Sequence, residues 1–252
     1  MTPLLLRVRR VMQKLTLRLR LARLMALEFE DTMPRSRVRV SFSQCGEDII
    51  AWWLLNELGI AQPRYLDIGA HHPTYLSNTA LFYLLGARGI NIEPDPALFR
   101  EFPRHRAGDV NLNIGIAPVA GVLTFYRMRD PSLNTFSATE ARRMAEEEGI
   151  PMVAEDKIPV ENINELLERL NFTPDLLSID VEGHDLPILQ NYDFSRRRPA
   201  VICAESLSFS TRRAGQKATT LISHLQQQGY VVRADTHINT LFVDAGRLAG
   251  RK

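Results

Sequence analysis

The sequence predicts an α/β fold in which parallel strands alternate with helices, and three neighbouring stretches carry that prediction. Residues 65–72 (Tyr-Leu-Asp-Ile-Gly-Ala-His-His) have the pattern of a buried strand that ends in a glycine turn. Residues 75–85 are apolar at near-helical spacing, and residues 89–94 form a second short apolar run that ends in an acid and a proline. The three stretches predict a strand, helix, strand unit at the centre of the chain.

An acid, Glu93, ends the second strand of this unit. It lies 24 residues after Gly69, a position from which an acid binds the ribose hydroxyls in dinucleotide-binding folds. The unit therefore predicts a nucleoside-containing ligand. A strand, turn and helix without any ligand is the alternative, and the combination of Asp67, Gly69 and Glu93 makes it the weaker one.

The glycine turn distinguishes between two nucleoside cofactors. NAD sites usually carry three glycines in the pattern G-x-G-x-x-G, because a pyrophosphate needs several backbone amides at the start of a helix. Here Gly69 is followed by Ala70, His71, His72 and Pro73. That loop suits a ligand without phosphates and with a zwitterionic amino-acid end, so the sequence favours S-adenosylmethionine over NAD.

Composition and charge limit the class of protein. The 252 residues, 45% of them hydrophobic, suit one α/β domain with a modest extension. Cys45 and Cys203 lie too far apart in sequence to indicate a metal pair or a disulfide framework, so a reducing, cytoplasmic setting is expected. Residues 1–27 hold seven basic residues and no acid, which leaves 24 basic and 29 acidic residues in the rest. An acidic body argues against an enzyme that binds nucleic acid.

Residues 1–30 predict a basic amphipathic helix. Its apolar stripe consists of Leu4, Val8, Val11, Met12, Leu15, Leu19, Ala22 and Ala26. Arginines interrupt the apolar residues too often for a transmembrane span or a signal peptide. Through residues 4–27 the helix could lie on the inner face of an anionic membrane, dock on a protein or in a coiled coil, or cover its own domain, and a transit peptide is a further interpretation. Residues 31–42 are expected to be a linker.

Residues 43–248 are expected to form the main domain. It should begin with a polar stretch, residues 43–48, whose Ser43 or Asp48 can cap an apolar helix at 49–58. After the central unit, the pattern predicts a short helix capped by Asp95, a strand over 109–117 and a β segment over 121–128. The polar insert at 129–160, with a charged helix at 138–148, is a candidate lid over the substrate, and a solvated surface excursion is the alternative.

The second half of the sequence predicts two buried strands that end in acidic residues. A capping box at Asn162 should start a helix that ends near residue 170. A buried strand then leads into Asp180, Glu182, His184 and Asp185, and another, over 199–205, ends in an acid. A helix over 218–228 and a hairpin of 230–233 with 240–243 should close the fold.

Six motifs together resemble the FkbM-type methyltransferases over about residues 41–245. They are Phe42-Ser43-Gln44 with Gly46-Glu47-Asp48, Leu66-Asp67-Ile68-Gly69-Ala70-His71, Ser77-Asn78-Thr79, Asn91-Ile92-Glu93-Pro94, Leu133-Asn134-Thr135-Phe136 and Ile179-Asp180-Val181-Glu182-Gly183-His184. The resemblance implies the seven-stranded class I methyltransferase sheet, Rossmann-like, with strand order 3-2-1-4-5-7-6, strand 7 antiparallel and helices on both faces. It also implies S-adenosylmethionine-dependent methyl transfer to a hydroxyl of a sugar, glycan or polyketide-like product.

The resemblance also implies roles for single residues. Asp67, Gly69 and Ala70 would meet the methionine end of the cofactor, Glu93 the ribose, and Asn113 or a neighbour the adenine. The full set expected to bind the cofactor is Gln44, Glu47, Asp67, Gly69, Ala70, His71, Asn78, Glu93 and Asn113. In the candidate lid, Asn134 and Thr135 are expected to contact the substrate.

Two mechanisms suit the acids that would face the methyl group. Asp180 or His184 could be a general base, because a sugar hydroxyl is a poor nucleophile at neutral pH. Alternatively Asp180 and Glu205, with or without His184, could hold a divalent cation such as Mg²⁺ that lowers the pKa of the hydroxyl. Helix capping is the competing interpretation of His184 and Asp185.

Three other functions need to be separated from this one. A nucleotide-dependent oxidoreductase is disfavoured by the missing glycines. A methyltransferase acting on the amino groups of nucleic-acid bases would normally carry a [D/N]-P-P-[Y/F] run, where this chain has Asp180-Val181-Glu182-Gly183. A non-catalytic nucleoside-binding module is the third.

Overall fold

The computed structural model describes residues 40–211 and 215–249. The basic helix expected at 1–30, and the linker except for residues 40–42, lie outside the described residues. Within the described residues, no helix is long and apolar enough to cross a membrane.

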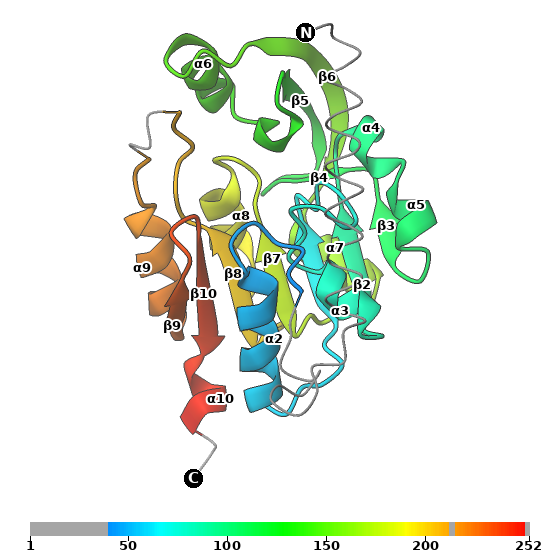
Figure 1. The fold of residues 1–252 in the computed structure, drawn as a ribbon, viewed down its shortest axis with the longest axis vertical. Helices are drawn as coiled ribbons and strands as arrows, with labels where there is room; N and C mark the ends of the chain where they lie inside the picture. Colours follow the sequence, from blue (N-terminus) through cyan, green and yellow to red (C-terminus); the bar gives the residue numbers. More distant parts are fainter. Residues whose placement is uncertain (1–39, 212–214, 250–252) are drawn as a thin grey trace, which may run out of the picture. The chain divides into compact units, whose positions relative to one another are not determined.

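A seven-stranded sheet lies at the centre of the domain (Figure 1). Its strands are β1 (Tyr65–Ile68), β2 (Gly89–Ile92), β3 (Val110–Leu112), β7 (Leu176–Ile179), β8 (Val201–Glu205), β9 (Tyr230–Asp235) and β10 (Asn239–Asp244). The order across the sheet is β3-β2-β1-β7-β8-β10-β9. β10 runs antiparallel to both of its neighbours, and the other pairs are parallel. The predicted fold class and strand order are therefore confirmed.

Helices cover both faces of this sheet. Successive residues of a strand point to opposite sides, so each face carries apolar side chains that pack against helices. On one face, Tyr65 packs with α2 (Glu47–Glu57) and α3 (Ala80–Leu84). On the other, Leu66 and Ile68 pack with α7 (Ile163–Arg169), α8 (Asp185–Asn191) and α9 (Thr219–Gln227). Short elements complete the domain: α4 (Pro96–Phe99), α5 (Phe102–His105) and α10 (Ala245–Ala249).

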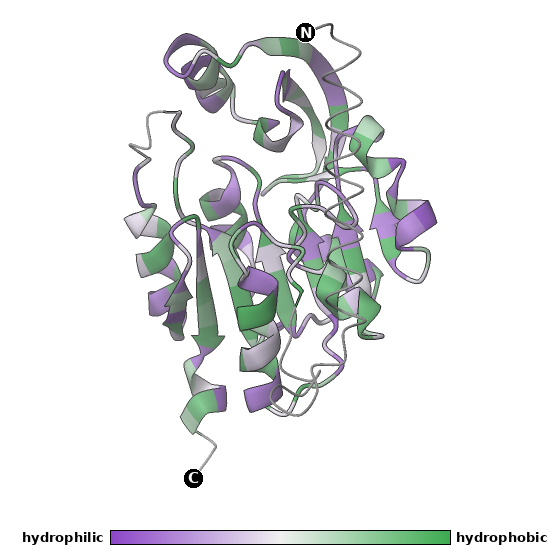
Figure 2. Ribbon diagram, viewed as in Figure 1, coloured by the Kyte–Doolittle hydropathy of each residue, from purple (hydrophilic) through white to green (hydrophobic). Residues whose placement is uncertain are grey.

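A second, three-stranded sheet carries the insert. It consists of β4 (Gly115–Ile116), β5 (Gly121–Met128) and β6 (Met152–Glu161), in the order β4-β6-β5. Between β5 and β6 the chain forms a 3-10 turn, η2 (Pro131–Leu133), and helix α6 (Ala138–Glu146). Figure 2 shows that the strands of the main sheet are largely apolar, whereas α6 and much of β6 are polar.

Two expected elements differ in the structure. The strand expected over 109–117 is divided into β3 in the main sheet and β4 in the second sheet. The helix expected over 75–85 begins only at Ala80, because the preceding side chains make other bonds: Thr79 donates to Asp67, and Ser77 accepts from the amide of Ala80.

Asn162 links the segment just before β5 to the segment just after β6. Its side-chain amide donates to the carbonyl of Pro118 at 2.6 Å, just before β5, while Asn162 itself follows the last residue of β6. Its side-chain oxygen accepts from the amides of Asn164 and Glu165 and so caps α7, as expected. One residue therefore fixes both connections of the insert to the main domain.

Candidate active site

A cavity of about 440 Å³ lies where β1, β7 and β8 end. The carboxyl ends of parallel strands meet at one edge of a sheet, and ligands of open α/β folds bind there. The volume is in the range of small-molecule sites. Eight of the sequence-predicted site residues line the cavity: Gln44, Asp67, Gly69, Ala70, His71, Asn78, Asp180 and Glu205.

The turn after β1 brings the backbone close to the next strand. Gly69 has φ +78°, and a side-chain carbon on it would lie 1.8 Å from the carbonyl oxygen of Asp180. Only glycine suits a position that combines a left-handed backbone with so close an approach. The amides of Gly69 and Ala70 both donate to the carbonyl of Ile92 at 3.0 Å, which fixes the turn against β2.

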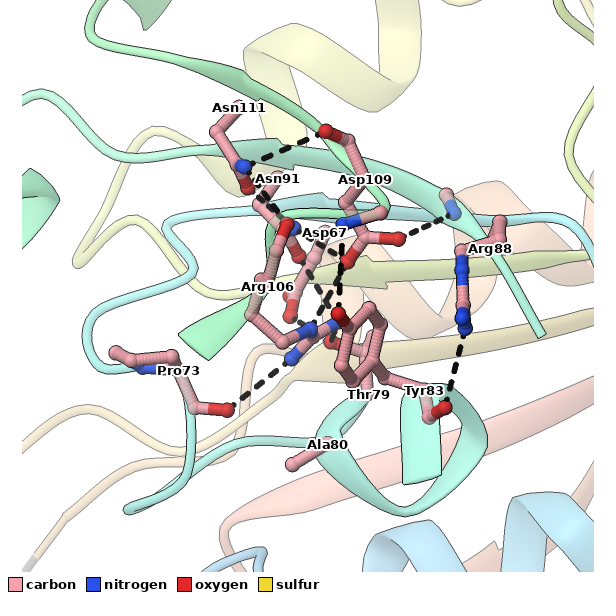
Figure 3. A network of polar contacts seen from close by, with 12 residues as sticks. Asp67, Pro73, Thr79, Ala80, Tyr83, Arg88, Asn91, Arg106, Asp109 and Asn111 are labelled. Atoms are coloured by element: carbon pink, nitrogen blue, oxygen red, sulfur yellow. Dashed lines mark hydrogen bonds and ion pairs between the residues drawn. The ribbon is translucent and has the colours of Figure 1, made fainter. Parts of the chain in front are cut away.

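A buried polar network holds the carboxylate of Asp67 behind this turn (Figure 3). The hydroxyl of Thr79 donates to Asp67 at 2.6 Å, and the guanidinium of Arg106 donates to the same hydroxyl. Arg106 also donates to the carbonyl of Pro73 and pairs with Asp109 at 2.9 Å. The arginine therefore connects the β1 strand with the loop that follows the turn.

Asn78 reaches across the sheet from the loop before α3. Its amide donates to the hydroxyl of Ser178 at 3.2 Å and lies 3.7 Å from the sulfur of Cys203. Ser178 pairs with Asp67 on one side and with Cys203 on the other, so the three side chains lie in one row on one face of the sheet. Asp67 and Ser178 of this row line the cavity, and Cys203 lies beside them outside the lining.

Three carboxylates gather at the ends of β7 and β8. Asp180, Glu182 and Glu205 each offer an oxygen, and these atoms lie within 4.8 Å of one another. All three line the cavity. The predicted pair of Asp180 and Glu205 is thus brought together, and Glu182 joins it.

Burial keeps this cluster from being fully ionised. Burial, and after it the charge of Asp185, raises the pKa of Asp180 to about 7. Burial and the neighbouring Asp180 raise the pKa of Glu205 well above its usual range, and the same two causes act on Glu182. At neutral pH the cluster therefore retains protons, unless a cation compensates its charge.

Glu93 and Asn113 lie beside the main cavity rather than in it. Glu93 lines a recess of about 40 Å³ that shares Gly69, His71 and Asp180 with the main cavity. Its two oxygens accept from the amides of His71 at 2.8 Å and Asp95 at 2.7 Å, and burial raises its pKa to about 8. Asn113 donates its amide to the carbonyl of Glu93, so it supports the position expected to meet the ribose.

The two candidate histidines differ in their access to the cavity. His71 lines both the cavity and the recess, has φ +52°, and its Nδ1 is buried without a hydrogen-bond partner in the described residues. The ring of His184 lies edge-on to Phe136 with 6.4 Å between centroids, and His184 lines neither space. Burial lowers the pKa of both rings, which favours neutral imidazole.

Three other predicted residues make structural bonds. Glu47 is fully buried and accepts from Thr236 and Asn239, which fixes α2 against the closing hairpin. Asn134 lines the recess and donates to Asp95, while the buried Thr135 donates to the carbonyl of Glu182. Their roles toward cofactor or substrate stay predictions.

Two sets of lining residues were missed by the sequence analysis. Residues 207–210 and 237–239 line the cavity, and neither stretch carries a recognisable pattern. Glu182 was named only as part of a motif, because its position next to Asp180 and Glu205 depends on a loop in which it takes φ +48°. Only its place in an acidic run after a buried strand could have indicated it.

Comparison with known proteins assigns the family. The sequence profile of the Methyltransferase FkbM domain matches residues 67–232, so the chain belongs to the FkbM methyltransferase family. A search of curated protein sequences found no significant match.

Two solved structures are similar to this chain. One is methyltransferase FkbM from Methylobacillus flagellatus KT, at 15% sequence identity and a TM-score of 0.43; the match covers 87% of this chain and 47% of that one. The other is a proposed RNA methyltransferase from Pyrococcus horikoshii, at 12% identity and a TM-score of 0.38, covering 91% of this chain and 98% of that one. This chain thus spans about half the length of the first of these proteins.

Proposed function

We propose that this protein transfers a methyl group from S-adenosylmethionine to a hydroxyl of a sugar, glycan or polyketide-like acceptor. The observation that carries the proposal is the carboxylate cluster of Asp180, Glu182 and Glu205, which faces the cavity beside the Gly69 turn. A hydroxyl must lose its proton during methylation, and a partly protonated carboxylate pair can accept it.

The residues around the cavity suit S-adenosylmethionine. The 440 Å³ cavity, lined by Asp67 and Asn78, and the adjoining recess, lined by Glu93, share part of their walls and together could hold one extended ligand. The orphaned Nδ1 of His71 lies in the wall that both spaces share, where a polar group of a ligand would satisfy it. Each oxygen of Glu93 keeps accepting capacity beyond its one backbone amide, as ribose hydroxyls require.

The carboxylates of the cluster would accept the proton that the acceptor hydroxyl loses. When bound, S-adenosylmethionine supplies a methyl group on a positively charged sulfur, which leaves as a neutral thioether. In the transfer the acceptor oxygen would gain a bond to the methyl carbon as the carbon–sulfur bond breaks, with the electron pair of that bond left on sulfur. The hydroxyl proton would pass to whichever of Asp180 and Glu205 is ionised. A pKa of about 7 makes Asp180 a stronger base than an ordinary carboxylate while much of it is still ionised at neutral pH.

A divalent cation is the second route to the same activation. Asp180, Glu182 and Glu205 would hold it, because closely spaced carboxylate oxygens are the ligands that Mg²⁺ prefers. Such a cation would lower the pKa of the acceptor hydroxyl. His184 remains an alternative base, although its ring lies outside the cavity lining.

Titration calorimetry with S-adenosylhomocysteine, the demethylated product, tests the proposal first. We expect micromolar binding, no binding of NAD, and methyl transfer to a hydroxyl acceptor. A magnesium requirement for transfer would select the metal route. NAD binding, or a folded protein that binds neither ligand, would contradict the proposed function.

A further inference from the structure

We propose that a second cavity, of about 670 Å³, binds the methyl acceptor and selects a neutral or amino-bearing sugar over an anionic one. The inference rests on the proposed function and names the substrate class of that same site. The cavity lies between α6 of the insert, the loop after β7, and residues 207–210 and 216–218 from the segment between β8 and α9. In Figure 1, α6 stands beyond the ends of the main-sheet strands.

The two cavities meet at the carboxylates. Glu182 and Glu205 line both of them. The groups expected to hold the cofactor, such as Gly69, Asn78 and Glu93, do not line the second cavity. A donor in the first cavity and an acceptor in the second would therefore approach the cluster from different sides, as an in-line displacement needs.

Three contacts hold the insert against the loops after β7 and β8, which together surround the second cavity. Glu148, just after α6, accepts from the amide of Thr211 at 2.7 Å and from its hydroxyl at 2.6 Å. Phe209 packs against the apolar core of the insert. At Gly183 a side-chain carbon would lie 2.8 Å from Cγ of Glu140, so the missing side chain allows α6 to approach the loop after β7.

The charge of the lining decides which acceptor suits it. Six acids line the cavity: Glu140, Glu147, Glu148, Glu182, Asp185 and Glu205. Burial raises the pKa of Glu182 and Glu205, so these two retain protons at neutral pH, and the other four outnumber the two basic residues of the lining. The two basic residues of the lining are already paired, Arg143 with Glu140 at 2.8 Å and Lys217 with Asp235 at 2.7 Å. The net negative charge of the lining would repel a phosphate or carboxylate on the acceptor. It would not repel a hydroxyl, and it would attract an ammonium group.

The remaining lining groups favour a sugar. Nη2 of Arg143 is buried without a hydrogen-bond partner in the described residues, and an acceptor hydroxyl could accept from it. Leu186, Leu207 and Leu221 provide apolar surface beside these polar groups. Sugars present both kinds of surface, with hydroxyls at the rim and carbon–hydrogen faces on the ring.

Saturation-transfer NMR on the full chain, saturated with S-adenosylhomocysteine, tests this inference. The probes are methyl glucoside, glucosamine and glucose 6-phosphate at equal concentration. We expect the first two to bind at least about tenfold better than the phosphate, because one or two like charges repel by that amount at partly screened distances. Equal or tighter binding of the phosphate, or no binding of the neutral and amino sugars, would overturn the inference.

Matched substitutions locate the site. Thr220→Trp, at an exposed α9 position of the cavity lining, should weaken methyl glucoside binding at least about tenfold by filling the space, while Thr219→Trp, exposed but outside the lining, should not. Glu147→Lys should improve glucose 6-phosphate binding several-fold relative to Glu146→Lys, its exposed neighbour outside the lining. Equal effects within each pair would place the acceptor elsewhere.

Binding of S-adenosylhomocysteine is the control that separates a failure of the proposed function from a failure of the acceptor assignment. All four variants should bind S-adenosylhomocysteine as the unaltered chain does, because none of these positions lines the first cavity. If the unaltered chain fails to bind S-adenosylhomocysteine, the proposed function falls. If it binds but the sugar results fail, only the acceptor assignment falls.

Discussion

Two groups of carboxylates lie on the same sheet, one buried and one half-buried, and their surroundings differ. Behind β1, Asp109 pairs with Arg106 at 2.9 Å, and both side chains are almost fully buried. At the ends of β7 and β8, Asp180, Glu182 and Glu205 lie together, and none of them takes part in an ion pair within residues 40–211 and 215–249.

The difference separates a group with a structural role from the group for which we propose a catalytic role. A buried charge with a cation and a full set of hydrogen bonds holds its surroundings in place. Carboxylates left close together without a cation lower the stability of the fold, and such groups are concentrated at functional sites. The first group therefore holds the turn after β1 in place, and the second is the group that we propose for catalysis.

Arg106→Met gives the largest expected effect on stability. The change leaves Asp109 buried without its cation, and we expect it to lower the free energy of unfolding by about 3–5 kcal/mol. Urea denaturation measures this, with Arg104→Met as the control, because the Arg104 side chain is 78% exposed and should matter by less than about 0.5 kcal/mol. Equal stability of the two variants would show that the Arg106 network is not structural.

Gly69→Ala tests the close contact between the two regions. An added carbon would overlap the carbonyl of Asp180, so we expect a loss of about 3 kcal/mol and weakened S-adenosylhomocysteine binding. Gly46→Ala is the matched control: Gly46 also has positive φ, +93°, but nothing lies within 4 Å of the added carbon. That variant should lose only about 1–2 kcal/mol. Similar losses in both would mean that the backbone conformation alone matters.

Asp180→Asn should separate activity from stability. We expect methyl transfer to fall at least about a hundredfold, equivalent to about 2.7 kcal/mol in the barrier, because the proton acceptor is lost. The variant should be no less stable than the unaltered chain, since one repelling charge is removed from the cluster. Turnover assays and urea denaturation of the same preparation measure both quantities. Retained turnover would remove Asp180 from the mechanism.

The pH dependence of stability gives the smallest effect. The folded-state pKa of Asp180 is about 7 and its unfolded value is about 4, so between these values the folded state binds a proton that the unfolded chain releases. Stability should therefore fall as pH rises from about 5 to 7, by about 1 kcal/mol per unit. Asp180→Asn should flatten this slope in urea denaturation series, and an unchanged slope would contradict the assigned shift.

The sequence predicted the main sheet well because its strands carry local signals. The inner strands are buried along their whole length and mostly apolar, with one polar residue in each: Asp67, Asn91 and Ser178. The resemblance to the family supplied their order. Local pattern also placed Asp67, Asp180 and Glu205 at the cavity, since strand ends of a parallel sheet converge.

Features that depend on non-local pairing were not predictable. β6 alternates exposed and partly buried residues and carries several charges, so it looks like a polar insert until it pairs with β5. Arg106 was missed for a similar reason. It lies in a charged, helix-breaking stretch, and nothing local indicates that its guanidinium is buried against β1 and β2.

The bonds of Asn162 make the insert an exchangeable cassette. Its two connections to the main domain lie side by side, because Asn162 binds the carbonyl of Pro118. Residues 119–160 could therefore be exchanged as one unit, provided that the replacement keeps Ser132 and Leu133, which line the first cavity, and Asn134 and Thr135, which bond to the main domain. In such a chimera the part that varies would be α6, which lines the second cavity, so the wall of that cavity could be changed without rebuilding the main sheet.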